Sequence, residues 1–113
     1  MTSKELGDDG EKRACQYLLN AGYEIIERNW RTKAGELDII VFKDDTLVFV
    51  EVKTRKTDIC GHPMEAITKS KYNHIKQGLY IYLQENPQYK KFRIDAVSVL
   101  LKPELKIEHL KNI

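Results

Sequence analysis

The stretch that decides the fold is "ELDIIVFKDDTLVFVEVKTR", residues 36–55. Residues 36–42 and 47–55 are rich in apolar and β-branched side chains and flank the turn "KDDT", which predicts a β-hairpin. Glu51 and Lys53 interrupt the second run, and their spacing places both side chains on one face of the strand. Because buried charge is costly unless it is paired or binds a metal, this face is expected to carry an ion pair or a metal site.

Closure of the hairpin at residues 44–45 fixes which residues lie opposite each other. Asp38 then faces Glu51, and Glu36 faces Lys53, all on one face of the hairpin. The other face is apolar and is expected to carry Leu37, Ile39, Val41, Val48, Val50 and Val52. Directly opposed like charges destabilise a sheet, so Asp38 and Glu51 predict a divalent cation such as Mg²⁺ between them. Lys53 is placed to orient a metal-bound water or to neutralise developing negative charge.

An alternative interpretation needs no metal. In it, Lys53 and Glu36 form a cross-strand ion pair, while Asp38 and Glu51 lie at a solvated end of the sheet. A register slip of one residue would move the charges to the opposite face, but it would also break the apolar face. The slip is therefore costly, and the sequence leaves both the metal and the ion-pair interpretations open.

The rest of the chain predicts two helices and three further strands. The helices are expected at residues 3–21 and 64–85, and the strands at residues 23–30, 92–101 and 105–110. Ser3 suits the N-cap of the first helix, Gly22 its C-terminal end, and Pro63 the start of the second helix. Residues 31–35, "RTKAG", are expected to form a loop. Three consecutive strands predict an antiparallel meander, and the long helix permits a crossover to a further strand of the same sheet, which gives a layered α/β fold with a mixed sheet.

Composition favours one soluble domain over residues 1–113, with 42% hydrophobic residues and a net charge of +2. No run of roughly 18 apolar residues is present, and the first residues do not resemble a signal peptide, so a cytoplasmic protein without membrane association is expected. Cys15 and Cys60 predict no disulfide framework. Cys60 and His62 have no further ligands at zinc spacing, so zinc is not expected.

Several segments together resemble a known family. They are "GDDGEKRACQYLLNAGY" at 7–23, "RNWRTKAGELDII" at 28–40, "VFVEVKTR" at 48–55, "KSK" at 69–71 and "FRIDAVSV" at 92–99. With Asp38, Glu51 and Lys53 in these positions, the chain resembles the catalytic core of the PD-(D/E)xK nucleases, which have the restriction-endonuclease-like fold. Over nearly its whole length it resembles the small bacterial YraN family of that fold, and it is similar to archaeal Holliday-junction resolvases.

The resemblance implies a metal-dependent endonuclease acting on DNA. It assigns Asp38 and Glu51 to binding of Mg²⁺ or Mn²⁺, Lys53 to assisting the attacking water, and Glu11 to a further metal contact. From periodicity alone, Glu11 is equally well explained as a solvated helix charge. Leu37 stands where the superfamily name has proline, whose role is not chemical. Glu36 is an additional acid that is expected either to bind the metal or, preferably, to hold Lys53.

Basic residues outside the central pair are candidates for contacts with the DNA backbone. These residues are Arg31, Lys33, Arg55, Lys69 and Lys71. Trp30 is a candidate for stacking on an unpaired base, or a partly buried side chain. The small size favours a structure-selective nuclease, or a module that acts as a homodimer or with a partner protein. Two alternatives remain: a non-catalytic module that binds nucleic acid or a partner on the same fold, and a structural domain whose charges form ion pairs.

Overall fold

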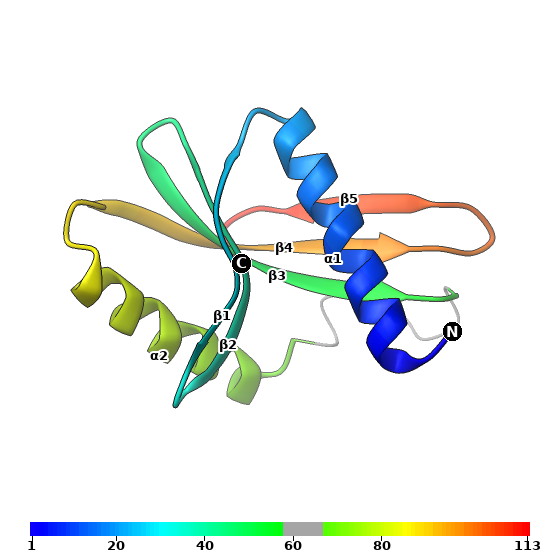
Figure 1. The fold of residues 1–113 in the computed structure, drawn as a ribbon, viewed down its shortest axis with the longest axis horizontal. Helices are drawn as coiled ribbons and strands as arrows, with labels where there is room; N and C mark the ends of the chain where they lie inside the picture. Colours follow the sequence, from blue (N-terminus) through cyan, green and yellow to red (C-terminus); the bar gives the residue numbers. More distant parts are fainter. Residues whose placement is uncertain (58–66) are drawn as a thin grey trace.

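The computed structural model describes residues 1–57 and 67–113, and it contains a mixed five-stranded sheet with two helices (Figure 1). The elements are α1 (Ser3–Asn20), β1 (Glu24–Thr32), β2 (Gly35–Lys43), β3 (Thr46–Arg55), α2 (Lys69–Glu85), β4 (Lys91–Leu100) and β5 (Lys106–Leu110). The strand order is β1-β2-β3-β4-β5, with β3 and β4 parallel and the other neighbours antiparallel. The predicted fold class, a meander followed by a crossover strand, is confirmed.

The ends of α1 are set by local hydrogen bonds. Thr2, and not the expected Ser3, is the N-cap, because its side chain accepts from Glu5 N while the Glu5 side chain accepts from Thr2 N. Gly22 has φ of 92°, the left-handed conformation that follows a helix end, as predicted. The helix therefore begins at Ser3 and ends at Asn20.

The second helix begins later than expected. Thr68 is its N-cap and accepts from Lys71 N at 3.1 Å, so Ile67 and Thr68 lie outside the helix. Because the Thr68 hydroxyl accepts a hydrogen bond from a backbone N–H of the first turn, the helix begins after Thr68. In the sequence, the apolar periodicity of residues 64–85 outweighed this capping signal. Pro63 and Met64 lie outside the described residues. The expected loop at 31–35 is also shorter, because β1 runs to Thr32 and β2 starts at Gly35.

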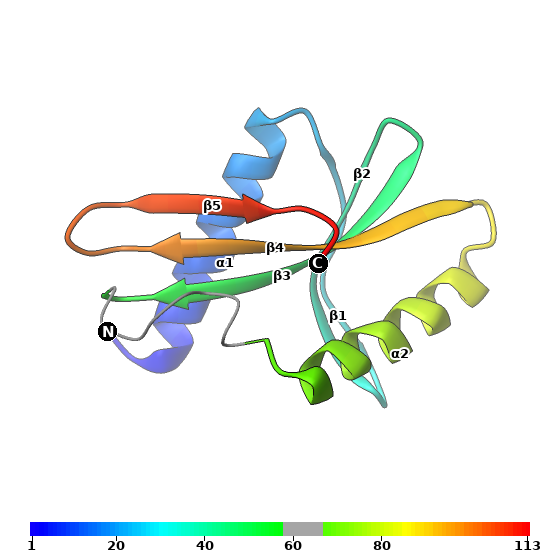
Figure 2. The same ribbon diagram turned by 180° about the vertical axis from the view of Figure 1, so that it is seen from behind.

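Alternate residues of β3 face two separate cores. Val48, Val50 and Val52 pack with Ala14 and Leu18 of α1. On the opposite face, Leu47 and Phe49 pack with three buried residues of α2, which are Ile75, Leu79 and Tyr82. The two helices therefore cover opposite faces of the sheet, as the two opposite views show (Figures 1 and 2). Cys15 is a buried free cysteine of the α1 core.

The predicted hairpin register holds for only part of the hairpin. Phe42 pairs with Leu47 and Ile40 with Phe49, as expected, and the ladder ends at Ile39 and Val50. Asp44 and Asp45 close the hairpin with φ of 51° and 62°, as a tight turn of this type requires. Beyond Ile39 the two strands part, and Leu37 packs in the α2 core instead of sharing the apolar face of Ile39 and Val41, as the alternation predicted.

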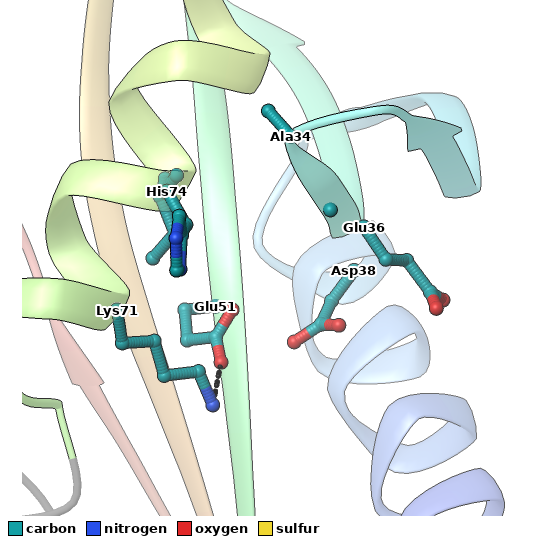
Figure 3. A pocket seen from close by; sticks show the side chains of 8 residues that line it. Ala34, Glu36, Asp38, Glu51, Lys71 and His74 are labelled. Atoms are coloured by element: carbon teal, nitrogen blue, oxygen red, sulfur yellow. Dashed lines mark ion pairs between the residues drawn. The ribbon is translucent and has the colours of Figure 1, made fainter.

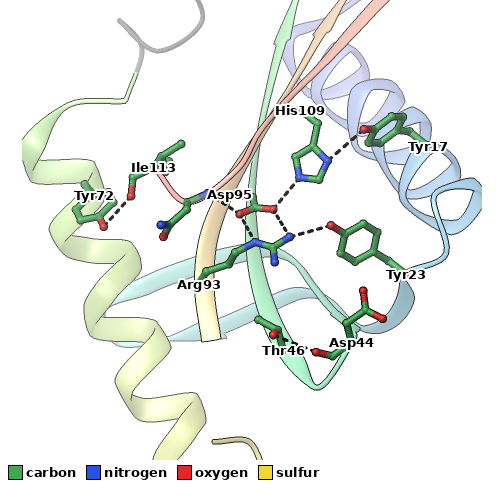
Figure 4. Close-up of polar contacts among 10 residues, drawn as sticks. Tyr17, Tyr23, Asp44, Thr46, Tyr72, Arg93, Asp95, His109 and Ile113 are labelled. Atoms are coloured by element: carbon green, nitrogen blue, oxygen red, sulfur yellow. Dashed lines mark hydrogen bonds and ion pairs between the residues drawn. The ribbon is translucent and has the colours of Figure 1, made fainter. Parts of the chain in front are cut away.

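A buried polar network ties the C-terminal strand to the rest of the fold (Figure 4). Asp95 of β4 is fully buried, and its carboxylate contacts His109 of β5 at 2.7 Å and Arg93 at 2.9 Å. Arg93 donates to the hydroxyl of Tyr23, and the His109 ring contacts the hydroxyl of Tyr17 in α1. In the part of the chain that the structure describes, no helix is long and apolar enough to cross a membrane.

Candidate active site

The site that contains Asp38 and Glu51 lies where the pairing of β2 with β3 ends. The Asp38 carboxylate turns toward β3, and its Oδ2 accepts a hydrogen bond from the backbone N–H of Val52 at 2.8 Å. The expected face-to-face pairing of Asp38 with Glu51 in the ladder is therefore replaced by a side chain to backbone bond. Because Glu51 precedes Val52 on the same strand, Asp38 is still fixed beside it. The Glu51 side chain is only 6% exposed.

Two hollows meet at these carboxylates. The first has a volume of about 290 Å³ and lies between the β1–β2 turn and α2; Glu36 and His74 are among its lining residues. The second lies toward the start of α1 and is lined by Glu11 and Lys53, among others. Asp38, Glu51 and Lys71 line both hollows. Figure 3 shows the Asp38 carboxylate pointing toward Glu51, whereas Glu36 points away from it.

The negative charge of Glu51 disfavours ionisation of Asp38. Burial, followed by the charge of Glu51, raises the pKa of Asp38 to about 8, although the hydrogen bond from Val52 opposes the rise. The raised pKa means that the surroundings of Asp38 disfavour its ionised form. A cation beside both oxygens would lower the cost of ionising Asp38.

Two lysines approach the pair unequally. The Lys71 Nζ forms an ion pair with Glu51, drawn in Figure 3, at 2.6 Å from Oε1. The Lys53 Nζ lies 4.0 Å from the same atom. Burial and the neighbouring Lys71 lower the pKa of Lys53. Burial alone would lower the pKa of Lys71 too, but its contact with Glu51 more than offsets this, so the pKa is raised. Lys71 was expected to contact DNA, and the structure places it inside the site as the direct partner of Glu51.

Glu11 lines the second hollow from α1, a position that helical periodicity alone left open. Its pKa is raised by burial and then by the charge of Glu36. With its amide nitrogen facing the two acids, Asn29 donates to Glu11 Oε1 at 2.8 Å and to Glu36 Oε1 at 2.6 Å. Glu36 was expected to hold Lys53, but its Oε2 lies 3.5 Å from Arg31 Nε instead. The reason is that β2 and β3 no longer pair at this point.

Comparison with known proteins places the chain in a family. Residues 10–99 match the model of the uncharacterised protein family UPF0102. The chain belongs to UPF0102. It is 44% identical to a UPF0102 protein of Syntrophomonas wolfei over 97% of both chains, and 41% identical to one of Caldicellulosiruptor saccharolyticus over 99% of this chain and 98% of the relative. A UPF0102 protein of Rhodococcus opacus is 43% identical over 95% of this chain and 93% of its own length.

The matched region of this UPF0102 chain contains every acidic residue and lysine that meets in the site. Asn29 also lies within it, although the sequence pattern predicted no role for this residue. Asn29 lies in the middle of β1 with φ of 52°, a left-handed conformation that asparagine tolerates better than most residues. This kink turns its amide toward Glu11 and Glu36. The only signal in the sequence is an asparagine, a poor strand former, within a strand of β-branched and aromatic residues.

The remaining expected DNA contacts lie around the site and not in it. Lys33 is exposed in the turn between β1 and β2, and Lys69 is exposed at the start of α2. Arg31 is exposed on β1, and Arg55 is half-buried at the end of β3. Trp30 is partly buried, with its ring 5.0 Å from that of Tyr82, which agrees with the packing interpretation.

The donors fit a hard divalent cation better than zinc. Asp38 and Glu51 supply carboxylate oxygens to a shared space, and Mg²⁺ commonly takes one or two carboxylates and keeps several waters. Within residues 1–57 and 67–113, no three His, Cys, Asp or Glu side chains converge closely enough to hold a metal by themselves. Glu11 therefore lines the site without completing a third ligand here. Cys60 and His62 lie outside the described residues.

Proposed function

We propose that this UPF0102 protein is a metal-dependent endonuclease that hydrolyses phosphodiester bonds in DNA. The observation that carries the proposal is the pair of half-buried Asp38 and buried Glu51, held side by side where β2 and β3 cease to pair, with two lysines beside Glu51. The resemblance of Asp38, Glu51 and Lys53 to the PD-(D/E)xK nuclease core supports the same conclusion. The fold, a mixed sheet between two helices, is compatible with that superfamily.

Each residue has a role that follows from its position. Asp38 and Glu51 would hold Mg²⁺ or Mn²⁺, with Glu11 on the α1 side of the hollow. A bound ion of this kind polarises a phosphoryl oxygen and lowers the pKa of bound water. Lys53 extends from the same strand as Glu51, so its ammonium is placed to orient the attacking water and to stabilise negative charge on the phosphate. Its lowered pKa suits contact with a water that loses a proton.

The substrate is best explained as DNA of a particular shape. The chain has 113 residues, and those that the structure describes form the sheet, two helices and short connections, with no separate recognition module among them. The exposed basic side chains of Arg31, Lys33 and Lys69 would contact phosphates. Phosphate contacts position a substrate without reading its sequence. Branched or flapped DNA, as in repair or recombination, is therefore the substrate class that we propose.

A cleavage assay tests the proposal. Purified protein is incubated with labelled single-stranded, duplex, flap and four-way-junction DNA in Mg²⁺, Mn²⁺ or EDTA. Glu51→Gln removes the charge at nearly constant volume, and Glu104→Gln is the matched control, in the exposed loop between β4 and β5 and outside the lining of both hollows. Metal-dependent cleavage that only Glu51→Gln loses supports the nuclease.

The second candidate is a non-catalytic module that binds nucleic acid or a partner. It is favoured by the ion pair between Lys71 and Glu51, which satisfies Glu51 without any metal. DNA binding that is equal in EDTA and Mg²⁺, with no cleavage of any substrate by the folded protein, would support this candidate over the nuclease.

A further inference from the structure

We propose that Lys71 is a built-in counter-ion of this site, whose ammonium occupies the place against Glu51 that a divalent cation needs and leaves it when the cation binds. This inference rests on the proposed function, since it concerns the same pair of carboxylates. It assigns to Lys71 the role of a counter-ion that the metal displaces, in place of the simple contact with the DNA backbone that the sequence suggested.

The geometry separates a fixed partner from a movable one. Glu51 is 6% exposed and lies on a central strand, so its carboxylate has little freedom to move. The Lys71 side chain is 38% exposed and reaches the site from the first turn of α2, on the opposite side of the hollow. It borders both hollows, so a change of rotamer moves its ammonium away from Glu51 without any movement of the sheet.

Charge balance explains why the ammonium must leave. Once both carboxylates are ionised, as metal binding requires, the charges of Asp38 and Glu51 are already balanced by those of Lys53 and Lys71. A divalent cation added to this set would create an excess of positive charge, and at 2.6 Å the ammonium also blocks an oxygen that the cation needs. Release of Lys71 removes both obstacles. The released ammonium is then free to meet the negative charge of a phosphodiester in the same hollow.

Competition between the Lys71 ammonium and a divalent cation for Glu51 makes an unusual prediction: loss of this lysine should raise the affinity for the metal. The test measures Mn²⁺ affinity without DNA, from the signal of free Mn²⁺ in electron paramagnetic resonance. Lys71→Gln removes the charge, Lys71→Arg keeps it, and Lys53→Gln removes the more distant ammonium. We expect Lys71→Gln to bind Mn²⁺ at least about fivefold more tightly than the wild type. Lys71→Arg should stay near the wild type, and Lys53→Gln should gain less than Lys71→Gln.

The possible outcomes separate this inference from the proposed function. Equal or weaker Mn²⁺ binding by Lys71→Gln, with wild-type binding that Asp38→Asn abolishes, overturns the role of Lys71 and leaves the metal site standing. Binding by Lys71→Gln where the wild type shows none supports the inference strongly. If neither protein binds Mn²⁺, or if Asp38→Asn binds it as well as the wild type, both proposals fail. A merely structural Lys71 would lower stability without raising metal affinity.

Discussion

Asp38 Oδ2 accepts a hydrogen bond from the backbone N–H of Val52 at 2.8 Å, just beyond the last ladder pair of β2 and β3. The carboxylate thus takes over the backbone partner that β2 ceases to provide. The same bond holds Asp38 beside Glu51, although their charges repel. One side chain therefore closes the gap in the sheet and supplies half of the candidate metal site.

We expect Asp38→Asn to stabilise the metal-free protein. The pKa of Asp38 is raised to about 8 in the fold, against roughly 4 in the unfolded chain, so ionisation costs stability as the pH rises from about 4 to about 8. Asparagine removes that cost and can still accept from Val52. Unfolding in EDTA at pH 7.5 should show a gain of about 0.5–2 kcal/mol, the usual trade-off at a functional site. At pH 4 the gain should shrink, and a variant less stable than the wild type at pH 7.5 would contradict the electrostatic account.

Two glycines of α1 should respond to alanine with opposite signs. A Cβ on Gly10 would overlap the Thr54 hydroxyl and lie 2.7 Å from its Cβ, so α1 must shift away from β3. A Cβ on Gly7 meets nothing within 4 Å. Gly10→Ala should cost about 1–3 kcal/mol, whereas Gly7→Ala should gain about 0.5–1 kcal/mol from helix propensity. Urea unfolding measures both. A stable Gly10→Ala protein would show that α1 packs less closely than the structure has it.

Substitutions at Asn29 should separate its backbone role from its amide. Asn29→Gly keeps access to the left-handed conformation and removes the two hydrogen bonds, whereas Asn29→Asp places a third acid between Glu11 and Glu36. Asn29→Asp should therefore cost more, about 1–3 kcal/mol of unfolding free energy at pH 7.5. Asn29→Gly should cost about 1 kcal/mol less than Asn29→Asp. Equal stability of the two variants would mean that the amide does not bridge the acids.

The network around Asp95 predicts a loss of stability in acid. Burial alone would raise the pKa of Asp95, but hydrogen bonds from His109 and Arg93 lower it below its usual value. Its contribution is therefore complete above the unfolded pKa of about 3.9 and is lost as the pH falls through the lower folded value. Asp95→Asn should cost at least about 2 kcal/mol at pH 7 and flatten the fall in stability below pH 4. Tyr17→Phe, a milder change in the same network, should cost about 1 kcal/mol and keep that fall. Denaturant titration at several pH values checks both, and an Asp95→Asn protein with an unchanged acid slope would contradict the assignment.

Local patterns in the sequence predicted the elements but not where they separate. Apolar alternation and the two aspartates of the turn were enough for the β2–β3 register from Ile39 to Lys43, and for the joint placement of Asp38 and Glu51. The same alternation misplaced Leu37, because the β2–β3 pairing ends at Ile39 and Leu37 instead packs beside Gly78 of α2. A contact with a helix much later in the chain is invisible to local alternation.

Long-range ion pairs were also beyond prediction. The sequence offered Lys71 only as one of several basic candidates for DNA contacts, because its contact with Glu51 depends on how α2 crosses the sheet. The bridge from Asn29 to Glu11 and Glu36 joins β1, α1 and β2 and requires a kink that no pattern announces. Such contacts between distant segments are set by the assembled fold and not by periodicity.

The most direct measurement is anomalous X-ray scattering from crystals soaked in Mn²⁺. The account predicts a single strong peak within coordinating distance of both Asp38 and Glu51, with the Lys71 ammonium withdrawn from Glu51. The Asp38→Asn protein, soaked in the same way, should lack the peak. A wild-type crystal with no peak at this pair, or with Mn²⁺ bound only elsewhere while Lys71 stays on Glu51, would contradict the assignment of these carboxylates to a metal-dependent site.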